Sequence, residues 1–388
     1  MNAGEQLLSA QMRAFEAPGE VEAGERGRRL MLAAFAERTP ARRRRRVRAP
    51  RLGWPLLAAL LTALGAGAVA VAGHLREGGS SRQNSAPFAP PVQLSEGVAL
   101  ALGNGVAYTF SARGRVRALG PASAGDLSPH GTNAVLASGT GLVAVHVADG
   151  QVRWRRTVPG PVLLPRWSVE RTVPPCCRVA FLAGGALYVV GGDGKNLRRV
   201  AAHALAVAPA WRPHASDHEL AFAAPSGIRL AATDGKLPPK RIGGAGRPIG
   251  LSWRADGRVL AAVDATGVTL YGAGGKVLQR IGGGGGTVLG GGYAPQGNRL
   301  VILRRDADGR VSVLTRGLAG PLRRIRRLAV TGVGDLRLSP DGRSALIAST
   351  EGDEWIDIRL RDGRQRLLIG IGKRLRAGFA PQALAWAP

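Results

Sequence analysis

The stretch LSWRADGRVLAAVDATGVTLYGAGGKVLQRI, residues 251–281, decides the fold. Its apolar residues fall in short runs in which they alternate with small or polar ones, as expected of β-strands with a buried face. Asp256-Gly257 and Gly274-Gly275 separate these runs, and we expect them to supply the positive φ angles of two-residue hairpins. The stretch therefore predicts four antiparallel strands joined by tight turns.

The same pattern recurs along the chain at steps of 40 to 48 residues. Each repeat opens with a bulky residue, and proline is often found two positions after it. These bulky residues are Leu127, Trp167, Trp211, Trp253, Tyr293, Leu338 and Trp386. A lone four-stranded sheet cannot bury both of its faces, whereas several sheets stacked radially can. The repeat therefore predicts a β-propeller.

The two ends of the repeat array complete each other. Residues 98–119 contain three expected strands without the opening unit, and residues 383–388 are that unit with nothing after it. We therefore predict an all-β, seven-bladed propeller over residues 97–388, built from four-stranded antiparallel blades. The last strand should join the three N-terminal strands as their innermost member, a closure that leaves few exposed sheet edges.

Two units carry a resemblance to a known family. LSPDGRSALIAS, residues 338–349, and LSWRADGRVLAA, residues 251–262, resemble the repeats of TolB-type and WD-repeat-like bacterial β-propellers. Several other repeats lack the Pro-Asp-Gly core of that family. LVAVHVADGQVRWRR, residues 142–156, is similar to a quinoprotein-type blade but occurs once. Because such propellers mostly serve as interaction platforms, the resemblance implies binding of a protein or peptide.

A membrane segment is predicted before the repeats. Residues 53–73, GWPLLAALLTALGAGAVAVAG, are 21 residues without a charge, which as a helix span a hydrocarbon core of about 30 Å. Trp54 lies at the start, where aromatic rings favour the membrane interface. A cleaved signal peptide is the alternative, because Ala70-Val71-Ala72 resembles a cleavage site, but the preceding leader of over 50 residues is too long for one. We predict a single transmembrane helix.

Arginines immediately before this segment predict its orientation. They are Arg42, Arg43, Arg44, Arg45, Arg46, Arg48 and Arg51. Basic residues favour the cytoplasmic side, so residues 1–52 form a cytoplasmic tail. The propeller would then lie outside the plasma membrane, and the Arg-, Ala- and Gly-rich composition is typical of a high-GC bacterium. Residues 74–96, with their Gly, Ser and Pro, predict a flexible stalk.

The tail contains two short helical patterns, one around Leu8, Met12 and Phe15 and one around Leu30 and Phe35. A short helical tail, one membrane crossing and an outer domain make a layout similar to that of bacterial membrane-bound anti-sigma factors, although a cysteine-histidine zinc motif is missing. This layout implies a cytoplasmic protein partner. The alternative is a disordered leader before the membrane.

Few residues indicate chemistry. The formal charge is +28, but the basic residues are spread along the chain and have no aromatic residues between them on which bases could stack, so we expect no nucleic-acid binding.

The candidate metal and phosphate ligands are also weak. We expect His214 and His218 to lie in a turn, and the sequence suggests no third metal ligand beside them. Gly282–Gly286 is not followed by the Lys-Ser/Thr of a phosphate loop. The adjacent Cys176 and Cys177 are expected to be thiols, with a vicinal disulfide as the alternative.

The residues that precede the bulky ones should point towards the central channel, because side chains alternate along a strand. They are Asp126, Arg166, Ala210, Ser252, Gly292, Arg337 and Ala385. Asp126, Arg166 and Arg337 are therefore candidate channel-lining residues. We expect an internal pair between Asp126 and an arginine, with water; the alternative is a bound anion or peptide carboxylate.

These observations predict a non-enzymatic protein without a metal or cofactor: a membrane-anchored, extracytoplasmic platform that binds a protein, a peptide or an envelope polymer. A transmembrane regulator of anti-sigma type, acting through its tail, is one alternative. A propeller enzyme with a metal or quinone is the other. The sequence leaves the ligand and the oligomeric state open.

Overall fold

The computed structural model describes residues 94, 96–169, 177–214, 218–234, 237–244, 246–318, 320–375 and 381–388. The predicted tail, the predicted membrane segment with its preceding arginines, and nearly all of the predicted stalk lie outside the described residues. Within these ranges, no helix has both the length and the apolar character needed to cross a bilayer. The described residues form one compact unit.

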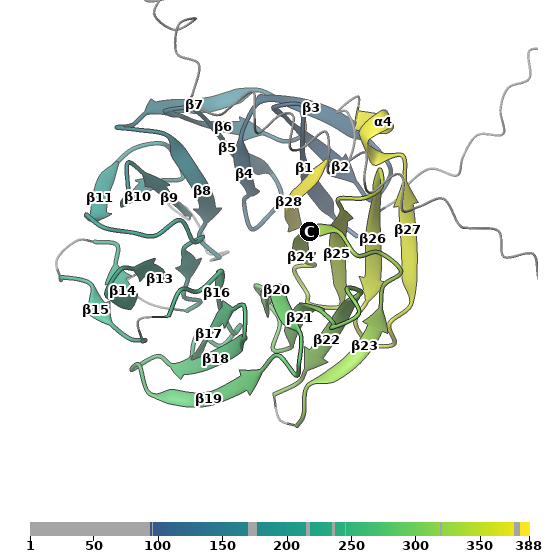
Figure 1. Ribbon diagram of the computed structural model, residues 1–388. Coiled ribbons are helices and arrows are strands. Elements are labelled where there is room, and N and C mark those ends of the chain that lie inside the picture. The colour runs from purple at the N-terminus through teal and green to yellow at the C-terminus, as the bar shows by residue number, and fades with distance from the viewer. Residues whose placement is uncertain are drawn as a thin grey trace, which may run out of the picture. The chain divides into compact units, whose positions relative to one another are not determined.

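This unit is a ring of seven four-stranded antiparallel sheets, the blades, as predicted (Figure 1). From the innermost to the outermost strand they are blade I, β28 (Gln382–Ala387), β1 (Val98–Gly103), β2 (Val106–Ser111) and β3 (Val116–Pro121); blade II, β4 (Ala124–Leu127), β5 (Asn133–Ser138), β6 (Gly141–His146) and β7 (Val152–Thr157); blade III, β8 (Val162–Trp167), β9 (Arg178–Ala183), β10 (Ala186–Gly191) and β11 (Arg198–Ala201); blade IV, β12 (Ala210–Trp211), β13 (Glu219–Ala224), β14 (Gly227–Ala232) and β15 (Lys240–Arg241); blade V, β16 (Gly250–Trp253), β17 (Val259–Asp264), β18 (Gly267–Gly272) and β19 (Val277–Gly282); blade VI, β20 (Thr287–Tyr293), β21 (Leu300–Arg305), β22 (Val311–Arg316) and β23 (Arg323–Arg327); and blade VII, β24 (Val333–Leu338), β25 (Ser344–Ser349), β26 (Glu354–Arg359) and β27 (Gln365–Ile369).

The hydrophobic core is divided into clusters that lie between neighbouring blades. Trp167, for example, packs with Val135 of blade II and Phe181 of its own blade III. Every bulky residue that opens a repeat lies in or against such a cluster. Because both faces of each sheet are covered by apolar side chains of its neighbours, the blades are stable only as a ring.

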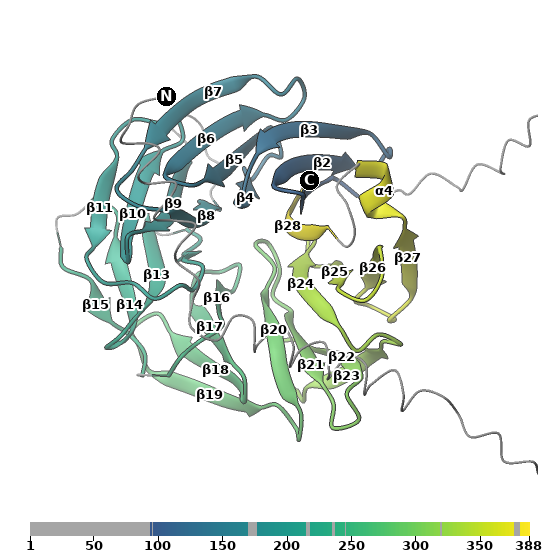
Figure 2. The ribbon, with the colours of Figure 1, turned by 45° about the horizontal axis from the view of Figure 1, so that its top comes forward.

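The predicted closure of the ring is confirmed. β28 pairs with β1 in an antiparallel register in which Val98 faces Ala387 and Ala99 faces Trp386. The indole N–H of Trp386 donates a hydrogen bond of 2.9 Å to the backbone carbonyl of Glu96. Figure 2 shows β28 next to β24, the inner strand of blade VII. Leu94, in the predicted stalk, is buried in the cluster between these two blades.

The prediction of two-residue hairpins at Gly257 and Gly275 is wrong in detail. Both glycines have positive φ, 65° and 92°, but the turns that contain them span residues 254–258 and 273–276. Asp256 stabilises the first of these longer turns by accepting a hydrogen bond from the backbone N–H of Arg258. In the second, the backbone N–H of Gly275 donates to the carbonyl of Gly272. Two-residue turns with two positive φ angles occur instead at Asn104-Gly105 and Gly184-Gly185.

A short helix, α4 (Ile371–Leu375), interrupts the connection from blade VII to blade I and was not predicted. The carboxylate of Asp353 accepts hydrogen bonds from the backbone N–H groups of Gly372 (2.5 Å) and Lys373 (3.2 Å), so it caps the first turn. Ile371 and Leu375 are buried between the two blades. The helix accounts for the longest step in the repeat.

Candidate functional site

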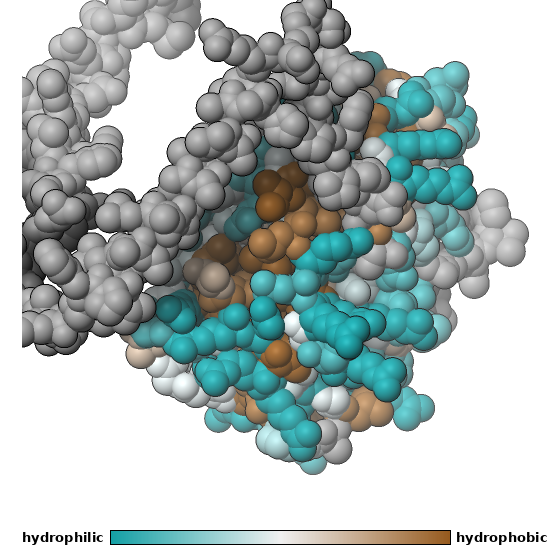
Figure 3. Space-filling view, turned by 90° about the vertical axis from the view of Figure 1, so that its right-hand side faces the viewer, coloured by the Kyte–Doolittle hydropathy of each residue, from teal (hydrophilic) through white to brown (hydrophobic). Residues whose placement is uncertain are grey.

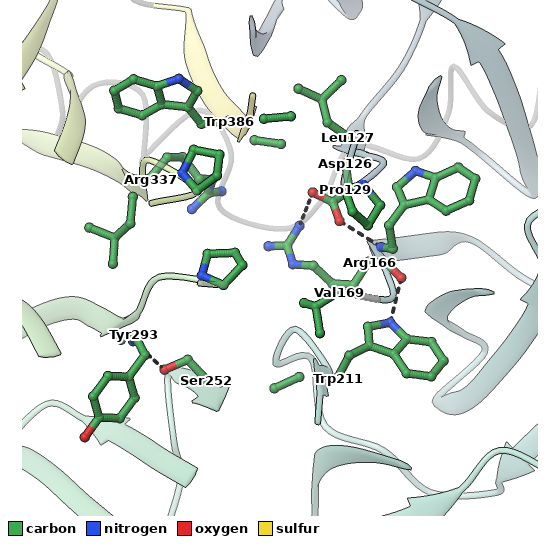
Figure 4. Close-up of a pocket in the computed structure, with 18 of the residues that line it drawn as sticks. Asp126, Leu127, Pro129, Arg166, Val169, Trp211, Ser252, Tyr293, Arg337 and Trp386 are labelled. Carbon is green, nitrogen blue, oxygen red and sulfur yellow. Dashed lines mark hydrogen bonds and ion pairs between the residues drawn. The ribbon is translucent and has the colours of Figure 1, made fainter. Parts of the chain in front are cut away.

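A cavity of about 290 Å³ lies where the innermost strands of all seven blades end (Figure 4). The residues that precede the bulky ones all line it: Asp126, Arg166, Ala210, Ser252, Gly292, Arg337 and Ala385. Pro129, Pro213, Pro295 and Pro340, from the turns that follow the inner strands, add an apolar margin. The cavity therefore combines a few charged groups with a rigid apolar rim, a composition typical of ligand-binding pockets.

Strand alternation explains why these residues face the cavity. The rings of Trp167, Trp211 and Trp253 are buried between blades, with 6%, 5% and 3% of their surface exposed. Because successive side chains of a strand point in opposite directions, the residue before each ring faces the axis. The repeat thus places one side chain from each blade at the channel.

Asp126 links blade II to blade III. One carboxylate oxygen accepts a hydrogen bond of 2.8 Å from the backbone N–H of Trp167, and the other lies 3.9 Å from the guanidinium of Arg166. Ser252 has the same role between blades V and VI, since its hydroxyl oxygen accepts a 2.9 Å hydrogen bond from the backbone N–H of Tyr293. These polar side chains satisfy N–H groups that would otherwise be buried without a partner.

Arg337 is held by the protein, whereas Arg166 keeps donors available. The Nε of Arg337 donates to the carbonyl of Leu384 (2.5 Å), and its Nη groups bond Leu336 and Asp335. Arg166 donates from Nη1 to the carbonyl of Pro165 (3.2 Å), while its Nε and Nη2 have no hydrogen-bond partner among the described residues. In Figure 4 the two guanidinium groups point into the cavity from different blades.

Burial controls the ionisation of the charged groups. Burial raises the pKa of Asp126 above its usual value, although the charge of Arg166 and the N–H of Trp167 act in the opposite direction. Burial and the neighbouring charge of Arg166 lower the pKa of Arg337, but a guanidinium stays protonated at neutral pH. Asp335, which is outside the lining, compensates Arg337 at 3.3 Å, whereas the only carboxylate near Arg166 among the described lining side chains is Asp126, at 3.9 Å. The positive charge available to an anionic ligand is therefore that of Arg166.

The backbone beneath the channel residues is fixed by tryptophans of the next blade. The indole N–H of Trp211 donates a 3.0 Å hydrogen bond to the carbonyl of Arg166, and that of Trp253 donates a 3.2 Å bond to the carbonyl of Ala210. Sequence reasoning missed this role of the tryptophans. Each tryptophan follows the residue whose carbonyl it bonds by 45 or 43 positions. This spacing matches the repeat and was the available signal.

The remaining candidate residues lie elsewhere. His214 and His218 lie in the connection between β12 and β13, where the sequence placed them, and both have positive φ. No group of three potential metal ligands is present in the part of the chain that the structure describes. Cys177 is buried, and Cys176 lies outside the described residues.

No family model and no curated protein match this chain. Solved structures do. A chain of a mitotic checkpoint complex is 14% identical, with a TM-score of 0.51 over 76% of this chain and 86% of that one. Together with the seven four-stranded sheets described above, this similarity shows that the chain has a seven-bladed β-propeller fold.

Two further structures are similar at the same 14% identity. The β-propeller domain of Cps50 (Swd1) from Myceliophteria thermophila has a TM-score of 0.49, over 64% of this chain and 86% of that one. Hydrazine synthase from Kuenenia stuttgartiensis has a TM-score of 0.48, over 61% and 76%. Similarity at this level concerns the fold alone, so the function of this chain has to be argued from its own residues.

Proposed function

We propose that this protein is a non-enzymatic binding platform whose channel cavity captures an acidic segment of a protein or peptide. The observation that carries the proposal is the pair of guanidinium groups in the cavity, of which Arg166 retains unused donors. A carboxylate bound there would take up to two parallel hydrogen bonds from one guanidinium. The prolines of the margin would contact the apolar part of the same segment.

The other polar groups of the cavity support binding over catalysis. The hydroxyl oxygens of Ser128 and Ser168 accept hydrogen bonds from the backbone N–H groups of Asn133 and Arg178, so they stabilise turns. Asp126 is engaged by Trp167. Of the described residues that line the cavity, none forms the hydrogen-bonded nucleophile and base pair that acyl or phosphoryl transfer requires.

The proposal includes a location. Residues 53–73 anchor the chain in the plasma membrane of a bacterium, with the arginines at 42–51 on the cytoplasmic side and the propeller outside. The support is the length and lack of charge of the segment and the asymmetry of the arginines around it. In this arrangement the cavity samples extracytoplasmic proteins, and an alternative role as an anti-sigma-type regulator would depend on residues 1–52.

Site-specific photocross-linking in intact cells tests the proposal. A photoreactive amino acid is placed at Pro340, on the cavity margin, and in a matched protein at Arg361, an exposed turn residue outside the cavity. The same partner captured from Pro340 and not from Arg361 is expected. Its acidic segment, made as a peptide, should bind the purified full-length protein, and Arg166→Gln should weaken this binding about tenfold while Arg258→Gln does not.

Two results would contradict the proposal. One is equal capture at both positions, and the other is peptide binding that Arg166→Gln leaves unchanged. Removal of residues 1–52 provides a separate comparison: loss of a cytoplasmic partner on this truncation, with nothing captured at the cavity, would favour the regulator instead.

A further inference from the structure

The outermost strands of the blades are basic. β3, β7, β11, β15, β19, β23 and β27 together contain fourteen Arg or Lys residues and no Asp or Glu. Most of these basic residues are exposed, including every arginine of β7 and β23. Because the outermost strands lie along the circumference of the ring (Figure 1), the structure gathers scattered basic residues into a band to which every blade contributes at least one, the basic rim.

Part of the basic rim has structural partners and part has none. Arg366 pairs with Asp357 of the neighbouring strand at 3.0 Å, and Arg156 donates to the carbonyl of Gly194 in the next blade at 2.5 Å. The side chains of Arg155, Arg199, Arg280 and Arg323 make no hydrogen bond or ion pair with a described residue. These four exposed cations come from blades II, III, V and VI, so the unpaired charge is distributed around the ring.

Protection of sheet edges explains charge on these strands, but not the lack of any acidic residue on all seven. An exposed edge strand is kept from pairing with other chains by charged side chains, among which lysine is common. Charges of a single sign repeated around a ring repel one another, which destabilises the compact state, and a partner of opposite charge relieves this repulsion.

Figure 3, which views the molecule from the side of β23 and β27, shows hydrophilic side chains over most of the described surface around a hydrophobic strip.

We propose that the basic rim binds a flexible, linear polyanion that lacks nucleobases, such as a chain of phosphate or carboxylate repeats. A flexible chain can follow a curved band, whereas a flat bilayer would meet one arc of it. Nucleic acid is disfavoured because proteins bind its single strands by stacking the bases on exposed aromatic rings. The outermost strands contain one aromatic residue, Trp154. Its ring is partly buried, and its indole N–H donates to the carbonyl of Gly192.

Binding of long-chain inorganic polyphosphate to the full-length protein tests the proposal. The rim variant replaces Arg155, Arg199, Arg280 and Arg323 with Gln. The matched control variant replaces Arg113, Arg258, Arg310 and Arg361, four exposed turn arginines, with Gln, so the two proteins have the same net charge. Circular dichroism and thermal unfolding first establish that both variants are folded. Both retain Arg42–Arg46, so any contribution of these arginines is equal in the two.

We expect the rim variant to bind polyphosphate at least tenfold more weakly than wild type, and the control variant to change by less than about twofold. The slope of log K against log salt should become shallower by about three in the rim variant, at roughly 0.7 to 0.9 per contacted charge. Single-stranded DNA of equal phosphate number should bind no more tightly than polyphosphate. Equal losses in the two variants, tighter binding of DNA, or a rim-specific loss of binding to anionic lipid vesicles and not to polyphosphate would each overturn the proposal.

Discussion

The indole N–H of Trp211 donates a 3.0 Å hydrogen bond to the backbone carbonyl of Arg166, an arginine that faces the channel from the preceding blade. Trp211 itself is buried between blades III and IV. One residue therefore fills an interblade cluster and fixes the backbone that presents a cavity side chain. The packing of the ring and the geometry of the binding site are coupled through this contact.

Trp211→Phe should destabilise the propeller more than Trp167→Phe. The first change leaves the part-buried carbonyl of Arg166 without its indole donor, which costs about 0.5–1.5 kcal/mol in addition to the lost ring volume. Trp167 is an internal control, because its indole nitrogen is buried and has no hydrogen-bond partner among the described residues. Chemical denaturation of both variants measures the difference. Equal losses would show that the hydrogen bond contributes nothing beyond packing.

Binding of an acidic peptide to the cavity should strengthen as the pH falls. Burial raises the pKa of Asp126, so this carboxylate takes up a proton at a higher pH than an ordinary aspartate does. Protonation removes the one negative charge beside Arg166 and leaves the cavity more positive, which favours an anion. A unit charge a few ångströms away contributes about one to several kcal/mol, so the expected gain in affinity is about tenfold.

A peptide whose acidic group is a sulfonate keeps its own charge over this range and isolates the effect of Asp126. The Asp126→Asn variant should bind this peptide more tightly than wild type at neutral pH and should show no pH dependence. Affinities measured by calorimetry between about pH 7 and pH 4 provide the check. Binding by the wild type that weakens as the pH falls would contradict the assignment.

Gly257→Ala should be more destabilising than Gly309→Ala. Both glycines have positive φ, 65° and 82°, so each substitution has the cost of about 1–2 kcal/mol for a side chain in the left-handed region. A Cβ on Gly257 would also lie 2.3 Å from the carbonyl oxygen of Pro213 in the previous blade, whereas one on Gly309 would have no neighbour within 4 Å. Thermal unfolding of the two variants isolates the contact between blades, and equal melting temperatures would argue against it.

Deletion of residues 381–388 should abolish cooperative unfolding of the propeller. Without β28, blade I has three strands, and Trp386 no longer covers the apolar side chains between blades I and VII. The expected species is expanded and prone to aggregate, because the edge of β1 is unpaired. Size-exclusion chromatography and calorimetry detect this state. A monomeric truncated protein with a sharp transition would show that closure is dispensable.

The number of blades and the closure of the ring were predictable because they depend on local patterns. Strand alternation, turn glycines and the bulky residue that opens each repeat are all short-range signals, and alternation also located Asp126, Arg166 and Arg337. A pair between Asp126 and an arginine was expected, and Arg166 lies 3.9 Å from its carboxylate. The backbone partners were not predictable, since the bond from Arg337 to the carbonyl of Leu384 depends on how one blade is rotated against the next. The helix α4 was missed because its five residues are too few for a periodic signal.

Ring closure also has a consequence for synthesis. The hydrogen bond from Trp386 to Glu96 joins residues 290 positions apart. At translation rates of about 5–20 residues per second, the first three strands of blade I wait roughly 15–60 s for their partner to leave the ribosome. Throughout that interval the inner edge of β1 is open to any other extended chain. The cell must therefore protect a nascent three-stranded blade until the final strand of the ring has been made.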